Sequence, residues 1–145
     1  MYKHILIATD GSELAGKAVT TGLKLAKALG ARVTAVTATE PWSAMIGPEG
    51  SAFSFPIEEY EKASAERAAE ILEAVRKQAL TLGVESKTLH VTEFPAEAII
   101  EAARTSACDL IVMASHGRRG IARALLGSQA ARVVTLSSVP VLICR

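Results

Sequence analysis

The sequence is poor in cysteine, in net charge and in long apolar runs, and each shortage excludes a class of protein. Its two cysteines, Cys108 and Cys144, fit neither a CxxC pattern nor a zinc-ligand spacing, so we expect reduced thiols rather than a disulfide or a zinc site. The formal net charge is only +1, so no global field attracts nucleic acid or an anionic membrane. No apolar run approaches the roughly 20 residues that span a bilayer.

Apolar residues, by contrast, are abundant, because half of the 145 residues are hydrophobic. A chain of this size and composition can bury the core of one ordinary domain without disulfides or a structural metal. It starts directly with a strand-like run, His4–Ala8, and shows no basic and apolar leader before it. We therefore expect a single domain over residues 1–145 and a cytoplasmic location.

Strand and helix patterns alternate along the whole sequence, which is typical of an α/β fold with a mostly parallel sheet. The third predicted strand alternates apolar and polar residues as an edge strand does, and Pro140 suits an edge or the start of the last strand. The strands are predicted at about residues 3–9, 32–39, 85–92, 109–114 and 139–144, and the helices at about residues 12–29, 57–82, 95–106 and 128–137.

One long loop, residues 40–56, interrupts this alternation and contains Trp42, Phe53 and Phe55. A connection of this length inside a domain is more often functional than idle. The aromatic side chains could cover a ligand crevice, but we expect them to pack against the following helix.

Residues 114–128 join an apolar strand to a helix through a basic loop punctuated by glycine. Gly117 is followed by nine residues and then by Gly127 and Ser128, with Ser128 expected near the N-cap of the helix. A helix N-terminus offers N–H groups and a partial positive charge, and glycine lets an anion approach the backbone closely. The pattern predicts a phosphate-binding loop.

Three strand ends should meet at the carboxyl edge of such a sheet: residues 8–10, residues 36–39 and the loop after residue 114. The apolar ends of the first two strands could flank a base. Asp10 could accept hydrogen bonds from a ribose or hold a metal ion, and the loop could surround phosphates. The predicted crevice therefore suits a nucleotide.

Several segments together resemble a known family: Ile-Ala-Thr-Asp-Gly-Ser, Pro-Ala-Glu-Ala-Ile, Asp-Leu-Ile-Val-Met-Ala-Ser-His-Gly, Leu-Leu-Gly-Ser and Val-Pro-Val-Leu-Ile. In this order, over essentially the whole chain, they look like a universal stress protein. The resemblance implies a five-stranded parallel sheet sandwiched by helices, a Rossmann-like fold of the adenine-nucleotide alpha-hydrolase type. It also implies that the ATP-binding branch, marked by G-x2-G-x9-G-[ST], is matched at Gly117, Gly127 and Ser128.

The resemblance implies ATP as the ligand, with or without Mg²⁺, and assigns residues to its parts. Ala8, Asp10 and Val36 would lie near adenine and ribose with Met113 and Ala114 beside them. The residues around the phosphates would be Gly117, Gly127, Ser128 and Gln129. His116 and Arg118 could also contact phosphate, and Arg119 and Arg123 lie in the same loop. The nucleotide-binding candidates are Ala8, Thr9, Asp10, Val36, Met113, Ala114, His116, Gly117, Arg118, Gly127, Ser128 and Gln129.

Ala114 departs from the motif, because it stands where the first glycine would be. If this position needs a left-handed backbone, the methyl group costs about 1–2 kcal/mol, or roughly tenfold in affinity. If the position needs only a small residue, alanine costs little. The sequence leaves both alternatives open.

Three functions remain open. We favour a stress-response or signalling module that binds ATP and hydrolyses it slowly or not at all, because no residue beyond Asp10 is placed to act as a base. The first alternative is a dimeric interaction protein, since the resemblance implies a homodimer built on the last strand, through Val139, Val141 and Ile143. The second alternative is a phosphohydrolase that depends on Asp10.

Overall fold

The structure, a computed structural model, describes residues 1–45, 56–117 and 126–145. The predicted strands and helices are all present, with bounds that differ from the expected ones by at most two residues. In chain order the elements are β1 His4–Ala8, α1 Glu13–Leu29, β2 Arg32–Thr39, the 3-10 turn η1 Trp42–Met45, α2 Ile57–Leu82, β3 Ser86–Thr92, α3 Pro95–Thr105, β4 Leu110–Ala114, α4 Ser128–Leu136 and β5 Val141–Cys144.

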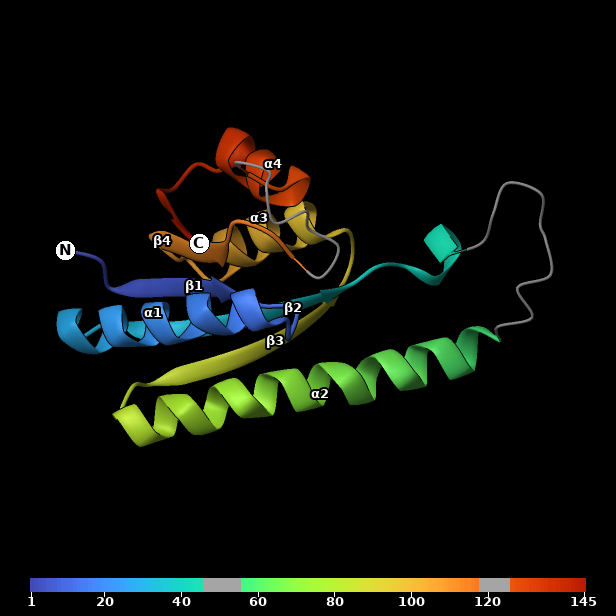
Figure 1. The fold of residues 1–145 in the computed structure, drawn as a ribbon, viewed down its shortest axis with the longest axis horizontal. Coiled ribbons are helices and arrows are strands. Elements are labelled where there is room, and N and C mark those ends of the chain that lie inside the picture. Colours follow the sequence, from blue (N-terminus) through green and yellow to red (C-terminus); the bar gives the residue numbers. More distant parts are fainter. Residues whose placement is uncertain (46–55, 118–125) are drawn as a thin grey trace.

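The five strands form one parallel sheet in the order β3-β2-β1-β4-β5 (Figure 1). The edge positions expected for the third and last strands are therefore confirmed. β1 lies at the centre, where the chain proceeds to β2 on one side and later returns to β4 on the other. Such a reversal of strand order opens a crevice at the carboxyl ends of the central strands, which is the usual ligand position in open α/β sheets.

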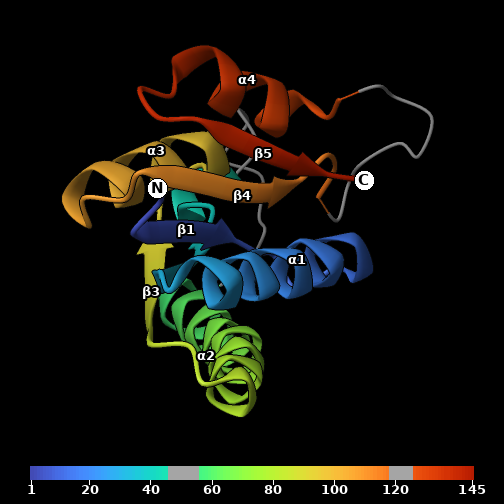
Figure 2. The same cartoon turned by 90° about the vertical axis from the view of Figure 1, so that its left-hand side faces the viewer.

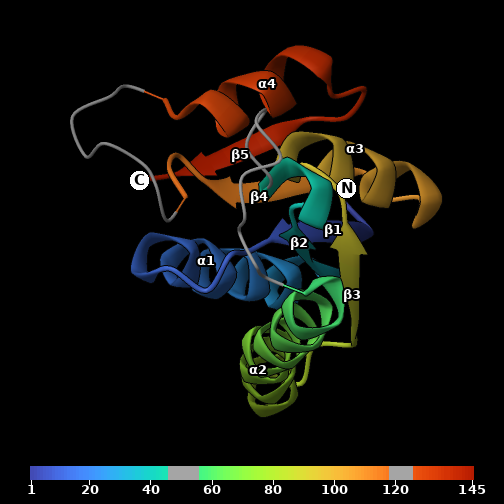
Figure 3. The same cartoon turned by 90° about the vertical axis from the view of Figure 1, so that its right-hand side faces the viewer.

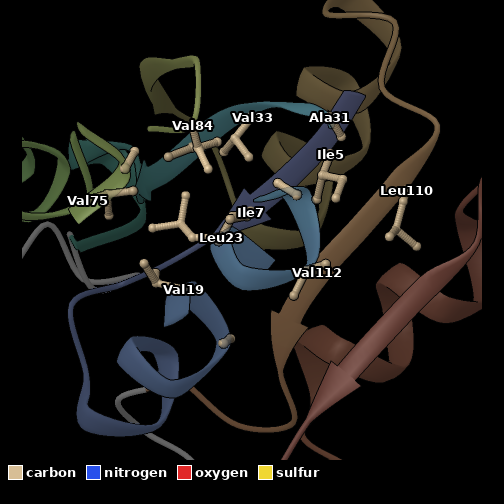
Figure 4. Close-up of a cluster of buried hydrophobic side chains, with 14 of the residues drawn as sticks. Ile5, Ile7, Val19, Leu23, Ala31, Val33, Val75, Val84, Leu110 and Val112 are labelled. Carbon is tan, nitrogen blue, oxygen red and sulfur yellow. The ribbon is translucent and has the colours of Figure 1, made fainter. Parts of the chain in front are cut away.

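Helices cover both faces of the sheet, so the predicted fold class is confirmed. Figures 2 and 3 show α1 and α2 on one face and α3 and α4 on the other. The alternation of β1 produces this sandwich, since Ile5 and Ile7 pack on the α1 and α2 side while Leu6 and Ala8 pack on the α3 and α4 side. Figure 4 shows the first of these two apolar clusters.

Local signals set the helix ends. The Ser12 hydroxyl accepts a hydrogen bond from the Ala15 N–H at 3.2 Å, which caps α1. Gly30 and Gly83, with φ of 67° and 71°, end α1 and α2 in the left-handed conformation that glycine adopts without strain. Pro95 occupies the first turn of α3, where its missing N–H costs nothing.

The two thiols differ in their surroundings. Cys108 is buried, and burial raises the pKa of its thiol to about 11, so that it stays protonated at neutral pH. Cys144 is only partly buried, and burial raises the pKa of its thiol as well.

His4 gives the fold a predicted pH dependence. Its ring Nε2 lies 2.7 Å from the Thr34 hydroxyl inside the sheet, and burial, followed by the charge of Arg32, lowers its pKa, although Asp109 opposes this shift. The folded state therefore favours neutral His4, and its contribution to stability is complete above the ordinary pKa of about 6.5 and is lost as the pH falls below it. We expect the free energy of unfolding, measured with urea from pH 7.5 to 5, to fall less steeply in His4→Leu than in the wild type. Equal slopes would contradict this role.

Candidate functional site

The ends of β1, β2 and β4 meet as the sequence predicts. The Thr9 N–H donates to the Val36 carbonyl at 3.0 Å, and β4 pairs with β1 in a register that places Val112 beside Ile7. Ala8, Val36 and Met113 belong to the same apolar cluster, on the α3 and α4 face of the sheet. The three residues expected to flank a base therefore lie on one side of the sheet, at its carboxyl edge.

Asp10 lies in the tight turn between β1 and α1. Its Oδ1 accepts a hydrogen bond from the Ser12 N–H at 2.9 Å, and the Thr9 hydroxyl accepts one from the Gly11 N–H at 3.2 Å. Gly11 has a φ of 79°, which permits this reversal of the chain. The turn therefore fixes the carboxylate at the carboxyl edge of the sheet, and the Thr9 side chain serves the turn.

The loop after β4 returns to this carboxylate. A Cβ atom placed on Gly117 would lie 2.8 Å from Oδ2 of Asp10. Of the described glycines, only Gly11, Gly30 and Gly83 have positive φ, so Gly117 is required for space and not for a left-handed backbone. Asp10 and Gly117, more than 100 residues apart in the sequence, are thus in direct contact.

The same loop closes on the start of α4. The Gly127 N–H donates to the Ser115 carbonyl at 2.7 Å, and a Cβ atom on Gly127 would lie 2.8 Å from that oxygen and 3.1 Å from Nδ1 of His116. Both Ser115 and His116 are buried. Asp10, Gly117, His116 and Gly127 therefore form a continuous series of contacts from the end of β1 to the start of α4.

The N-cap of α4 is Gly127, whereas the sequence places it near Ser128, which is the first residue of the helix. The difference arises because Gly127 has an extended backbone and its carbonyl accepts the first helical hydrogen bond, from the Ala131 N–H at 2.9 Å. Gly127 has no side chain with which to cap this terminus. The N–H groups of Ser128, Gln129 and Ala130 have no acceptor within the helix, as in the first turn of any helix, and are the donors expected of an anion site.

Gln129 uses its side chain elsewhere. Its amide oxygen accepts a hydrogen bond from the Ala96 N–H of α3 at 3.1 Å. The side-chain oxygen, which can only accept, is thus engaged with α3, and the backbone N–H, which can donate to a phosphate, belongs to the first turn of α4. Sequence patterns give no signal for this contact, because it joins two helices 33 residues apart.

The methyl group of Ala114 neither strains the backbone nor enters the face of the sheet that holds Ala8 and Val36. Among described residues other than glycine, only Ala107 has a positive φ, so Ala114 has the ordinary backbone of a strand, as the last residue of β4. Its methyl group packs in the cluster on the α1 side of the sheet, whereas the preceding Met113 packs on the opposite side. The left-handed alternative is therefore excluded, and the methyl group points away from the face that holds Ala8 and Val36.

Other predicted features lie outside the described residues or away from the crevice. Arg118, Arg119, Arg123, Phe53 and Phe55 fall in residues 46–55 and 118–125, which are not described. Trp42 lies in η1, which contacts α2, and the Tyr60 hydroxyl of α2 donates to the Glu40 carbonyl at 2.6 Å. This arrangement agrees with packing against the following helix.

Neither a metal cluster nor a membrane span accompanies the crevice in the described part of the chain. There, no three His, Cys, Asp or Glu side chains are grouped to hold a metal ion. No helix in the described ranges is long and apolar enough to cross a membrane. A depression of about 740 Å³ lies at the opposite, amino edge of the sheet, lined by residues that include His4, Lys27, Gly30, Gly83 and Asp109.

The similarity to known proteins extends over the whole chain. The model of the universal stress protein family matches residues 1–145. A universal stress protein of Thermus aquaticus, named for the 3′ region of a QAH/OAS sulfhydrylase, is 37% identical over 147 residues, which cover all of both chains.

Two solved structures agree with this fold. The structure of MJ0577 from Methanocaldococcus jannaschii has a TM-score of 0.81 and 30% identity and covers 99% of this chain and 96% of its own. A universal stress protein in complex with cAMP has a TM-score of 0.74 and 29% identity, covering 99% and 97%. Given the match to the family model over every residue, the chain belongs to the universal stress protein family.

Proposed function

We propose that this protein is a stress-response module that binds ATP at the carboxyl edge of its sheet. The observation that carries the proposal is the closure of the loop after β4 on α4 by the 2.7 Å bond from the Gly127 N–H to the Ser115 carbonyl. This closure brings the first turn of α4 to the crevice that Asp10 borders. A structural relative at 29% identity was solved in complex with cAMP, which supports an adenine nucleotide as the ligand.

The parts of the site fit the parts of the ligand. Ala8, Val36 and Met113 are buried in the apolar cluster at the strand ends and would underlie adenine, and the Asp10 carboxylate can accept hydrogen bonds from ribose hydroxyls. The N–H groups at the start of α4 suit phosphate oxygens, since charge-assisted hydrogen bonds are each worth about 1.5–3 kcal/mol. A few such contacts are enough for micromolar affinity.

Calorimetric titration tests the proposal. We expect ATP with Mg²⁺ to bind with a micromolar dissociation constant and adenosine to bind more weakly, because adenosine cannot use the first turn of α4. If hundreds of micromolar ATP produce no heat, the proposal is wrong. In the same samples, phosphate release faster than about one turnover per minute that is lost in Asp10→Ala would favour the phosphohydrolase alternative over a binding module.

The contact between Asp10 and Gly117 provides a second test, because the effects of substituting these two residues on ATP affinity should depend on each other. Gly117→Ala should lower the affinity for ATP by about tenfold, since its methyl group would displace the carboxylate 2.8 Å away. Asp10→Ala should also lower the affinity, through the lost ribose acceptor. In the double variant, Gly117→Ala should cost much less than in the wild type, because the displaced group is gone. Additive effects in calorimetry would show that the contact is not part of the site.

We also propose that two copies associate through the free edge of β5, which pairs with β4 on its other side. An exposed apolar strand edge favours such pairing. Val139, Val141 and Ile143 pack inward against the α3 and α4 cluster, so the contact would use the strand backbone together with exposed side chains. The exposed apolar residues on β5 and α4 are Leu142, Val134 and Leu136.

Leu142→Lys is expected to weaken this dimer at least tenfold without unfolding the protein, because Leu142 is 37% exposed at the strand edge. Light scattering at tens of micromolar measures the mass. Leu80→Lys on α2, where the leucine is 70% exposed, is the matched control and should leave the mass unchanged. A wild-type monomer at these concentrations would overturn the dimer proposal.

A further inference from the structure

The N-terminus of α3 lacks a capping side chain of its own. Its N-cap residue is Phe94, which has no side-chain acceptor, and Pro95 follows in the first turn. The Ala96 N–H nevertheless has an acceptor, the Gln129 amide oxygen at 3.1 Å. Ala96 is fully buried, so an N–H left without this partner would carry the cost of a buried donor. α4 therefore supplies the missing cap of α3.

A second contact joins the same two turns. The Arg132 guanidinium of α4 contacts Oε1 of Glu97, with its Nε at 2.7 Å and its terminal nitrogen at 2.5 Å. The Glu97 N–H and Arg132 both lower the pKa of the Glu97 carboxyl. Both side chains of this ion pair are substantially exposed, so solvent weakens it relative to the part-buried bond of Gln129. Of the two contacts, the Gln129 bond is thus the stronger tie.

From this geometry we infer that Gln129 is a positioning residue for phosphate binding. Its side chain fixes the first turn of α4 to α3, while its backbone N–H and those of Ser128 and Ala130 are the first-turn donors that the proposed function assigns to phosphate. The inference rests on the proposed function and deepens it: the side-chain oxygen of Gln129, held by the Ala96 N–H, acts on the phosphates through the placement of the helix. Because coupling is reciprocal, bound phosphate should also strengthen the tie to α3.

The test replaces Gln129 with Met, which has similar length and no amide acceptor. Amide hydrogen exchange at Ala96 should become about fivefold faster, as expected for the loss of one hydrogen bond. Affinity for ATP should fall by about fivefold, whereas affinity for adenosine should change less than twofold. Gln129→Glu keeps an acceptor oxygen and should restore slow exchange at Ala96. Arg132→Met, which removes the exposed ion pair, should have a smaller effect on both readouts.

Each outcome of this test either supports or contradicts the positioning role of Gln129. Unchanged exchange at Ala96 in Gln129→Met would overturn the tie between the helices. Faster exchange with equal changes in ATP and adenosine affinity would assign Gln129 to stability alone and overturn the positioning role. If the wild type binds neither ligand, the proposed function fails and the positioning role fails with it, while exchange at Ala96 still reports separately on the contact.

Discussion

Replacing Gly127 with alanine is expected to lower the affinity for ATP by about a hundredfold while the protein stays folded. The added methyl group would lie 2.8 Å from the Ser115 carbonyl oxygen and 3.1 Å from Nδ1 of His116. A backbone oxygen cannot swing aside as a flexible side chain does. The bond between Gly127 and Ser115 must therefore lengthen, and the first turn of α4 must move with it. A hundredfold loss corresponds to about 2.7 kcal/mol, within the usual cost of overpacking.

The matched control is Gly16→Ala in α1, where a methyl group would meet no atom within 4 Å. Its affinity for ATP, measured by the same calorimetric titration, should equal that of the wild type. Far-UV circular dichroism of Gly127→Ala should match the wild type, which separates loss of binding from loss of folding. Wild-type affinity in Gly127→Ala would mean that the start of α4 takes no part in binding.

Replacing Gly22 with valine is expected to reduce the free energy of unfolding by about 3 kcal/mol, the upper range for overpacked cores. Gly22 lies where α1 crosses the sheet, and a Cβ atom there would be 2.6 Å from Cδ1 of Ile7 and 3.4 Å from Cγ1 of Val112. Both neighbours are completely buried and belong to the cluster in Figure 4. The larger side chain forces α1 away from β1, because close-packed interiors have no spare volume.

Gly16→Val is the control for helix propensity, since it makes the same substitution in the same helix at a site with open space. Its free energy of unfolding in urea should stay within about 0.5 kcal/mol of the wild type. If Gly16→Val and Gly22→Val are equally destabilised, the effect comes from the helix and not from the contact with Ile7.

The arrangement of strands and helices could be predicted from the sequence because its signals are local. Ser12, Gly30 and Gly83 mark helix ends through the backbone conformations and hydrogen bonds that they favour, and the helix bounds agree with them. The parallel direction of the strands follows from the alternation of strands and helices along the chain. The meeting of Ala8, Val36 and Met113 on one face also follows, because strand periodicity and a parallel register decide which residues share a face.

Tertiary contacts could not be predicted in this way. Whether position 114 has a left-handed backbone depends on how β4 ends, which the motif does not encode. The sequence pattern assigns Gly117 to the close approach of an anion, but its need for space also arises from Asp10, which a distant turn supplies. Gln129 shows the same limit: its position suggests a phosphate ligand, whereas its side-chain oxygen binds α3.

We propose that ATP binds at the carboxyl edge of the sheet, between the turn at Asp10 and the start of α4. Amide NMR spectra recorded during a titration with ATP test it most directly. We expect the largest shift changes at the amides of Ser128, Gln129 and Ala130, with little change at Gly30 and Gly83, which line the depression at the amino edge. Shift changes centred on Gly30 and Gly83, or none at hundreds of micromolar ATP, would contradict it.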